Sequence, residues 1–418
     1  MQRVLSLEQS PPLQAVLRFF LSTPLFVLLA GALLAWQGPD ALVSRWSPCT
    51  LALTHLLTLG ALGMSMTGAL IQILPVVAGV NLARIRAPLM HALLGVGTLA
   101  LAAGFLSGAP WLFRAALATL IPVLLWLCGC VTVALWQPQA AGAAPMLGTV
   151  RLAVGSLVIT LALAAMLGAA FAWPGMPSPL PLLRATDLHA MWGVFGWGGL
   201  LVAGVAFQVV PMFQVTPLYP DAVHQRLGVA VFLLLVASSA EALFARTGVI
   251  AAYACFAGVT LWLLARRKRP QPDAMTLFWR LSMASLGACF LLWLMPDHIA
   301  GPGRPLALGI LAIVGFLYSA INGMLYKIVP FLIWHHLQDN AAPGVRAPGV
   351  KHILPDAKAR AQFWVQAGAL LLLLAACWHP ASLARPAGLA LAVSAMWLGW
   401  NLTRAISRPW PAMPVASR

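Results

Sequence analysis

Charge is what this sequence has least of. Asp, Glu, Lys and Arg together make up 8% of the 418 residues, and only 9 residues are acidic. A soluble globular domain carries roughly a quarter charged residues, because water must solvate its surface. Since 61% of the residues are hydrophobic, the composition excludes a water-soluble globular protein and predicts an integral membrane protein covered by lipid.

Motifs of soluble-type catalysis and of common metal sites are also missing. The six cysteines form neither C-x-x-C nor C-x-x-C-H, so we expect neither a cysteine zinc site nor covalently attached haem. The chain has no Walker A motif, no H-E-x-x-H, no nucleophile elbow and no dinucleotide fingerprint. Nothing here predicts an enzyme of those classes.

The net charge of +16 could indicate nucleic-acid binding, but the basic residues are distributed differently. They occupy short segments between apolar runs and form no continuous basic face. We therefore expect the lipid bilayer to be the main partner and nucleic acid not to be one.

Twelve apolar runs approach or exceed the roughly 20 residues that cross a bilayer as a helix. The sequence thus predicts an all-α polytopic membrane protein with twelve transmembrane helices, in a single integral membrane domain over residues 1–418. The first run shows no clear cleavage site, so we interpret it as a retained helix. The runs lie at about 15–36, 50–79, 87–107, 110–135, 148–173, 187–213, 225–246, 247–266, 274–295, 303–337, 361–380 and 386–406.

The charge of the loops predicts the orientation. With a cytoplasmic N-terminus, eighteen of the 25 Lys and Arg residues fall on the cytoplasmic side, and Lys327 stays inside a span. The positive-inside rule then predicts a bacterial inner-membrane protein with both termini in the cytoplasm, segment 338–360 cytoplasmic and segment 174–186 periplasmic. The six basic residues left outside are Arg45, Arg114, Arg184, Arg246, Arg304 and Arg385.

Three spans share one signature, in which five positions coincide. Because they are the second, sixth and tenth spans, we predict three parallel four-helix units, about 15–135, 148–266 and 274–406, related by a pseudo-threefold axis along the membrane normal. Their small residues serve helix packing or the approach of a flat ligand. The matching sets are Gly60, Gly63, Gly68, Gln72 and Pro75; Gly196, Gly199, Gly204, Gln208 and Pro211; and Gly315, Tyr318, Gly323, Lys327 and Pro330.

Each signature places a polar residue inside the membrane, namely Gln72, Gln208 and Lys327. Each lies three residues before a proline, whose missing N–H frees a backbone carbonyl that the side chain can satisfy. The alternative is a proton or ion path. That alternative is strongest for Lys327, because an unpaired lysine in the membrane costs several kcal/mol.

Two of the nine histidines, His55 and His189, lie at the outer ends of repeat helices. His55 lies about five residues into its span, roughly 7 Å deep at ~1.5 Å per residue. Such an imidazole is either a hydrogen-bonded interfacial side chain or a ligand of haem iron or another metal. The other seven lie at the inner ends of spans, in loops or at edges: His91, His224, His298, His335, His336, His352 and His379.

Twelve helices, three units, cytoplasmic termini and a helix-2 histidine resemble the haem–copper oxidase subunit I superfamily. The segment from Thr54 and His55 through Gly68 to Pro75 and Gly79 resembles, more narrowly, the NnrS-type membrane haem proteins that are linked to nitric-oxide stress. The resemblance implies haem b on His55, with His189 as the first candidate for the opposite face. It also implies contact with a redox partner protein.

The oxidase pattern is incomplete, since helix 10 lacks a histidine in its outer half and helix 7 lacks the copper-binding pair. We therefore expect no oxidase activity. The register also raises a conflict, because His55 lies seventeen residues before its repeat Gln and His189 nineteen. Two residues turn a helix by about 200°, so each histidine could pair with another group instead, such as Met64 or Met191.

Three functions remain open at this stage. The first is a b-type haem protein that handles a small redox ligand such as nitric oxide or passes electrons. The second is a transporter, for which repeats and a buried lysine are typical and copper is a natural cargo for His and Met near the outer face. Against it, Glu241 is the only acidic residue that we place inside a span. The third is a scaffold subunit.

Overall fold

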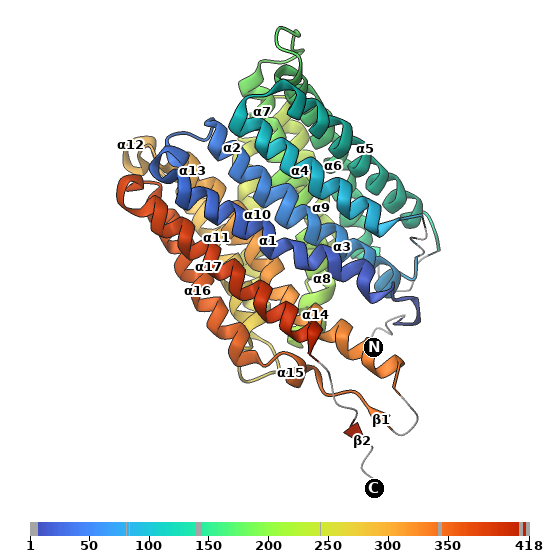
Figure 1. Cartoon of the computed structure of the whole chain (residues 1–418). Coiled ribbons are helices and arrows are strands. Elements are labelled where there is room, and N and C mark those ends of the chain that lie inside the picture. The colour runs from blue at the N-terminus through green and yellow to red at the C-terminus, as the bar shows by residue number, and fades with distance from the viewer. Residues whose placement is uncertain are drawn as a thin grey trace.

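The structure, a computed structural model, describes residues 7–80, 82, 84–138, 144–242, 244–341, 345–408 and 413–414. In this part of the chain, twelve helices are long and apolar enough to cross a membrane, which confirms the predicted multi-pass membrane fold (Figure 1). The spans are Leu13–Leu42, Pro48–Ala78, Ala87–Ser107, Pro110–Leu135, Pro145–Ala172, Leu182–Gln214, Asp221–Ser239, Ala245–Ala265, Ala274–Leu294, Arg304–Asp339, Asp356–Ala376 and Pro380–Ser407.

Several spans consist of more than one element. The elements are η1 Leu7–Gln9, α1 Leu13–Gln37, η2 Gly38–Leu42, α2 Pro48–His55, η3 Leu56–Gly63, α3 Met64–Ile73, η4 Leu74–Ala78, α4 Ala87–Ser107, α5 Pro110–Leu135, α6 Ala144–Ala172, α7 Leu182–Met191, η5 Trp192–Gly199, α8 Leu200–Gln214, α9 Asp221–Ser239, α10 Ala245–Ala265, α11 Ala274–Leu294, α12 Asp297–Ala300, α13 Arg304–Ile310, η6 Leu311–Tyr318, α14 Ser319–Asp339, β1 Val345–Arg346, α15 Val350–Ile353, α16 Asp356–Ala376, α17 Pro380–Ser407 and β2 Met413–Pro414. Strands β1 and β2 pair antiparallel.

Local chemistry sets several helix ends. The Ser47 side chain accepts from the Thr50 N–H at the start of α2, and the Asp273 carboxylate accepts from the Thr276 N–H at the start of α11. Both satisfy backbone donors that a helix N-terminus leaves unpaired. Gly108 ends α4 with φ 69°, in the left-handed region that favours glycine.

The division between the seventh and eighth spans was predicted wrongly. We placed it at Arg246, but α9 ends at Ser239 and α10 begins at Ala245. The turn between them uses Glu241 at φ 58° and Phe244 at φ 62°, two non-glycine residues in the left-handed region. Such turns carry no Gly or Pro signal. Glu241 therefore lies in the turn and not, as predicted, within a span.

The three repeat spans form the interior of the bundle. In their most apolar stretches 83%, 67% and 78% of the residues are buried, against 50% or less in the other nine spans described. The η3 segment packs against η6, and η5 packs against η6 as well. The helices that carry the signature are therefore central, and the remaining spans surround them.

Each repeat span contains an eight-residue π-helical segment in the same register. These segments, η3, η5 and η6, begin sixteen residues before Gln72, Gln208 or Lys327 and end nine residues before it. Such segments are rare and are often found at functional sites. The sequence repeat is therefore a structural repeat of these three helices.

The repeat glycines pack against equivalent helices. A Cβ at Gly60, Gly196 or Gly315 would meet Phe26, Ser156 or Ser285, on the spans that directly precede them. The glycine eight residues further along each signature faces the same helix two turns away: Gly68 meets Phe19, Gly204 meets Thr149 and Gly323 meets Phe278. The first two helices of each unit thus pack alike. The threefold relation of whole units stays a prediction.

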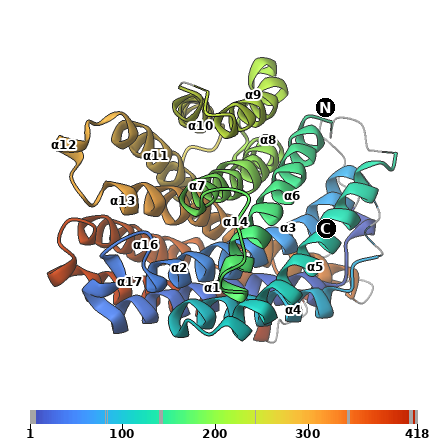
Figure 2. The ribbon, with the colours of Figure 1, turned by 90° about the horizontal axis from the view of Figure 1, so that it is seen from above.

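The first and last spans lie side by side and close the bundle. Figures 1 and 2 both show α1 beside α17, and α1 begins at the end of the bundle where α17 finishes. Gly31 and Gly388 bring their backbones together, since a Cβ on Gly388 would lie 2.7 Å from the Gly31 carbonyl oxygen. Small residues at such a crossing allow the close approach of two helices in a membrane.

Candidate functional site

The two histidines singled out in the sequence meet in the structure. His55 is the last residue of α2, directly before η3, and His189 lies in the last turn of α7, three residues before the start of η5. Their ring centroids are 6.2 Å apart and their planes differ by 20°. Both side chains are half-buried. We call this end of the bundle the histidine end, and the end with Lys327 the lysine end.

The separation of the rings matches two imidazoles on one metal atom. A metal–nitrogen bond of about 2.0–2.1 Å, added to the ~1.1 Å from ring nitrogen to ring centre, places each centroid about 3.2 Å from the metal. Two such rings on opposite sides have centroids about 6.3 Å apart. The observed 6.2 Å therefore fits ligation of one metal by both rings.

The hydrogen bonds of the two rings engage Nδ1 and leave Nε2 unprotonated, which is the form that can bind a metal. His55 Nδ1 lies 2.8 Å from the Leu51 carbonyl oxygen, and His189 Nδ1 lies 3.2 Å from that of Thr160. A carbonyl can only accept, so Nδ1 carries the proton in each ring and Nε2 keeps its lone pair. A metal-binding histidine usually donates its other N–H to such an oxygen. Both rings are thus in the ligating tautomer.

An aromatic cluster borders the histidine pair. The His55 ring lies 5.2 Å from that of Phe105, which in turn packs against Phe113 at 5.3 Å and Phe171 at 5.7 Å. These phenylalanines come from the ends of α4, α5 and α6 at the histidine end. They give the pair an apolar border that suits a flat apolar ligand.

An ion pair holds the two histidine helices together. Asp187, two residues before His189, lies 2.8 Å from Arg45, which precedes α2. Arg246 at the start of α10 lies 3.9 Å from the same carboxylate. The Arg45–Asp187 pair therefore fixes the start of the His55 span against the start of the His189 span.

The register conflict between the two histidines is resolved by packing. We argued from the repeat that rings two residues out of register point in different directions. When two repeat-related helices pack against each other, each uses a different face for the contact. Side chains that meet at the contact therefore need not occupy equivalent positions in the repeat. Met64 lies nine residues beyond His55, about 14 Å along the helix, and is fully buried beside Gly95. The rings pair with each other.

The glycines that follow His55 have different surroundings. A Cβ on Gly60 would lie 2.3 Å from the Phe26 ring, so this residue serves helix packing and not the approach of a flat ligand. Gly63 is buried, and a Cβ there would meet within 4 Å only the Thr58 carbonyl of its own span. Space beside the helix is therefore available at Gly63.

Several other histidines are bound to neighbouring oxygen atoms. His91 Nε2 lies 2.7 Å from the Ser22 hydroxyl, His224 Nε2 lies 2.8 Å from Asp221 and His335 Nδ1 lies 2.9 Å from Asp339. His336 faces Asn340. These contacts are what interfacial, structural histidines make.

The intramembrane lysine is paired, and the sequence did not reveal its partner. Lys327 Nζ lies 2.6 Å from Asp273, whose other oxygen accepts from the Thr276 N–H and from Gln214 Nε2. One carboxylate thus joins α8, α11 and α14 at the lysine end. The only local signal was the position of Asp273 directly before a span, where aspartate caps a helix.

The other two intramembrane polar residues differ from Lys327. Gln208 is 4% exposed. Gln72 keeps a buried side-chain oxygen with no hydrogen-bond partner among the described residues. The shared sequence position therefore hosts different local interactions in the first and third repeats.

Replacing Asp273 with Asn is expected to lower the free energy of unfolding by about 1–3 kcal/mol, because Lys327 then lacks its counter-ion. Burial raises the pKa of Asp273, but the Lys327 ammonium and the hydrogen bonds from Lys327 and Thr276 outweigh it and lower this pKa to about 2. The stabilisation is therefore present above pH ~4, the ordinary pKa of Asp, and is lost as the pH falls toward 2.

Thermal unfolding in detergent at neutral pH measures this effect. Asp40→Asn is the control, since Asp40 is exposed, and we expect a change below about 0.5 kcal/mol. Equal stability of the two variants would show that the Lys327 pair contributes nothing.

Five side chains of spans 9 to 11 carry buried polar atoms without a hydrogen-bond partner. Within the described residues, Trp279 Nε1, the Tyr318 hydroxyl, both Asn322 amide atoms, Gln362 Oε1 and Gln366 Nε2 have no hydrogen-bond partner. All five side chains are at most 1% exposed. The Ser394 hydroxyl links the two glutamines, accepting from Gln362 at 2.9 Å and donating to Gln366 at 2.7 Å. Buried polar groups normally bind protein atoms or water.

No protein-family model and no curated protein matches this chain. The resemblance to haem–copper oxidases and NnrS-type proteins therefore rests on the residues alone. In the described part of the chain, no three His, Cys, Asp or Glu side chains are close enough to hold a metal ion. The histidine pair therefore offers two side chains that could act as ligands.

Proposed function

We propose that this protein is a b-type haem protein of the bacterial inner membrane without oxidase activity, with His55 and His189 as the two axial ligands. The observation that carries the proposal is the 6.2 Å separation of two nearly parallel rings, each donating from Nδ1 to a backbone carbonyl. The resemblance to NnrS-type proteins extends it to nitric-oxide or respiratory stress.

Haem suits a site with two protein ligands. The porphyrin supplies four nitrogens, so the iron needs only two protein ligands, whereas a zinc ion usually takes four ligands. The Phe105, Phe113 and Phe171 cluster would give apolar surroundings for the macrocycle. The haem, when bound, would supply one-electron redox chemistry.

The residues themselves favour electron transfer over gas binding. His55 and His189, each held by a carbonyl hydrogen bond, would both bind the iron and would leave no free position on it for a small ligand. The Arg45–Asp187 pair keeps the two helices at a fixed separation, which limits reorganisation at the site. A redox partner protein would therefore dock at the histidine end.

An optical spectrum tests this proposal. Protein purified in detergent after expression with haem available is expected to show a Soret band and, on reduction, the sharp visible bands of six-coordinate b-type haem. Purified, folded protein without a Soret band would contradict the proposal.

We expect both termini and the segment 338–360 to lie in the cytoplasm, and the segment 174–186 in the periplasm. The reason is the excess of Lys and Arg in the inner segments. Reporter fusions after the C-terminus and within each segment measure the orientation. A periplasmic signal from the C-terminal fusion would contradict it, and would also place the histidine end in the cytoplasm.

A membrane transporter is the second candidate. The observation that favours it is the set of buried polar atoms without partners, on Asn322, Gln362, Gln366 and two further side chains of spans 9 to 11. Polar groups inside a membrane commonly line the path of a small polar solute. Transport of a solute such as copper by haem-free protein in proteoliposomes would favour this function.

A further inference from the structure

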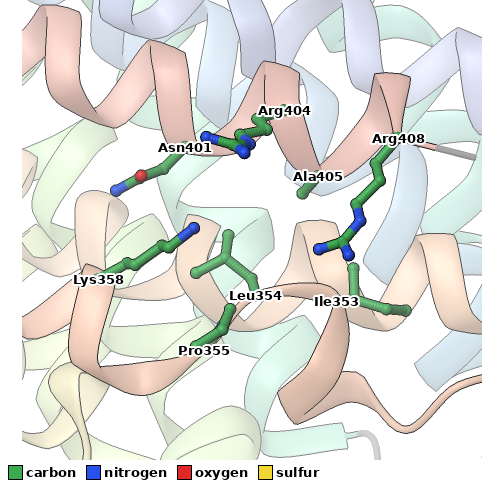
Figure 3. Close-up of a pocket in the computed structure, with 8 residues that line it drawn as sticks. All are labelled: Ile353, Leu354, Pro355, Lys358, Asn401, Arg404, Ala405 and Arg408. Carbon is green, nitrogen blue, oxygen red and sulfur yellow. The ribbon is translucent and has the colours of Figure 1, made fainter.

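A pocket with a basic rim lies at the lysine end, far from the histidines. It has a volume of about 40 Å³ and is formed by the C-terminal turns of α17 and by the segment that joins α15 to α16 (Figure 3). Its lining residues are Ile353, Leu354, Pro355, Lys358, Asn401, Arg404, Ala405 and Arg408. Three of these eight are cationic and none is acidic.

The cations face one another across the pocket. Figure 3 shows the Lys358 ammonium group and the Arg404 guanidinium group turned toward the same space, with the Arg408 guanidinium group beside it. Among the described residues no carboxylate lies within 4.0 Å of Lys358 or Arg404, although Arg360, nearby on α16, is paired with Asp356 at 2.8 Å. Facing like charges repel one another unless an anion lies between them.

The positions of the cations distinguish this pocket from an ordinary basic surface. Arg404 lies in the last turn of α17, where the helix dipole stabilises a positive charge. Lys358 is the third residue of α16, and the dipole at that end disfavours a cation. A bound anion would therefore stabilise Lys358 beside Arg404.

The walls of the pocket indicate the kind of anion. Ile353 and Leu354 are apolar and buried. They lie beside the charged groups, where span 11 begins and span 12 ends. Asn401 is held by the Tyr326 hydroxyl, to which its Nδ2 donates at 3.0 Å. Lysine and arginine are donors only, so the ligand must be an acceptor, as phosphate oxygens are. An apolar wall beside cations at the membrane surface suits an amphiphile.

We propose that this pocket binds the phosphate group of an anionic phospholipid in the leaflet at the lysine end. The lipid phosphate lies between Lys358 and Arg404, and its glycerol and first acyl carbons lie against Ile353 and Leu354. Basic pockets between membrane helices commonly bind such headgroups.

The test compares ligands and variants of the full-length protein in detergent. Native mass spectrometry measures binding of phosphatidylglycerol, phosphatidylcholine and inorganic phosphate to the wild type and to Lys358→Gln/Arg404→Gln. The wild type is expected to retain one phosphatidylglycerol molecule. Each charge near an anionic lipid contributes about fivefold, so the double variant should bind it at least tenfold more weakly.

A matched control separates a site from diffuse attraction. Lys351→Gln/Arg226→Gln removes the same charge from exposed residues outside the pocket, and we expect less than a threefold loss. If the double variant in the pocket does not fold, Lys358→Gln alone is used, because this side chain is exposed. Equal losses in pocket and control variants, equal retention of phosphatidylcholine, or a phosphate affinity that equals the lipid's would each overturn the proposal.

Discussion

Replacing His55 with alanine is expected to abolish the six-coordinate b-type spectrum. The ring is one of only two imidazoles at the site, and a single remaining axial ligand holds haem far more weakly. We expect haem retained after purification to fall at least tenfold, measured by the pyridine haemochrome assay against protein concentration. His189→Ala should cause a similar loss, since the two rings lie beside each other with centroids 6.2 Å apart.

Haem that remains in either variant gives a second measurement. One axial position is then open, so reduced protein should bind carbon monoxide and shift its Soret band, whereas the wild type should not. His298→Ala is the matched control, because His298 is exposed on the short helix α12, and its spectrum should equal that of the wild type.

Two outcomes would contradict the ligand assignment. One is a double variant, His55→Ala/His189→Ala, that keeps a full six-coordinate spectrum. The other is a wild type that binds carbon monoxide as readily as the single variants. Asp187→Asn separates positioning from ligation: loss of the pair with Arg45 should lower the temperature at which haem is released and leave the spectrum unchanged.

Replacing Gly388 with alanine is expected to give the largest loss of stability of any small substitution. The added Cβ would lie 2.4 Å from the Ala35 backbone nitrogen and 2.7 Å from the Gly31 carbonyl oxygen. Backbone atoms cannot rotate away as a side chain can, so α1 and α17 must separate. Overpacking of this kind costs about 1–3 kcal/mol, and more where backbone must shift.

Thermal unfolding in detergent, followed by loss of the monodisperse peak, measures this cost. Gly129→Ala on α5 is the matched control, since nothing lies within 4 Å of its Cβ and the residue is exposed. Alanine there should be neutral or slightly stabilising. If Gly388→Ala prevents insertion, Gly31→Ala tests the same contact from α1. Variants at 31 and 388 as stable as the control would show that the two helices are not tightly packed.

The sequence by itself determined the membrane fold and most of its boundaries. Span lengths and composition predicted all twelve spans, because the bilayer requires about 20 apolar residues for each crossing and that requirement is local. The repeat signature also marks the three spans that form the interior of the bundle. Where the same close helix contact is repeated, the glycine that permits it is repeated in the sequence. Gly60, Gly196 and Gly315 are such glycines, each packed against the preceding span.

Tertiary structure alone decided what depends on residues far apart in the chain. His55 and His189 meet, despite their register, because two separate spans face each other there. Lys327 finds Asp273 across a contact between α14 and α11. No local pattern in the sequence indicated the three π segments or the turn at Glu241, because packing against neighbouring helices stabilises them. The hydropathy of a segment reflects its contact with lipid. A functional site depends instead on the distances between side chains of different segments, and no local sequence pattern contains those distances.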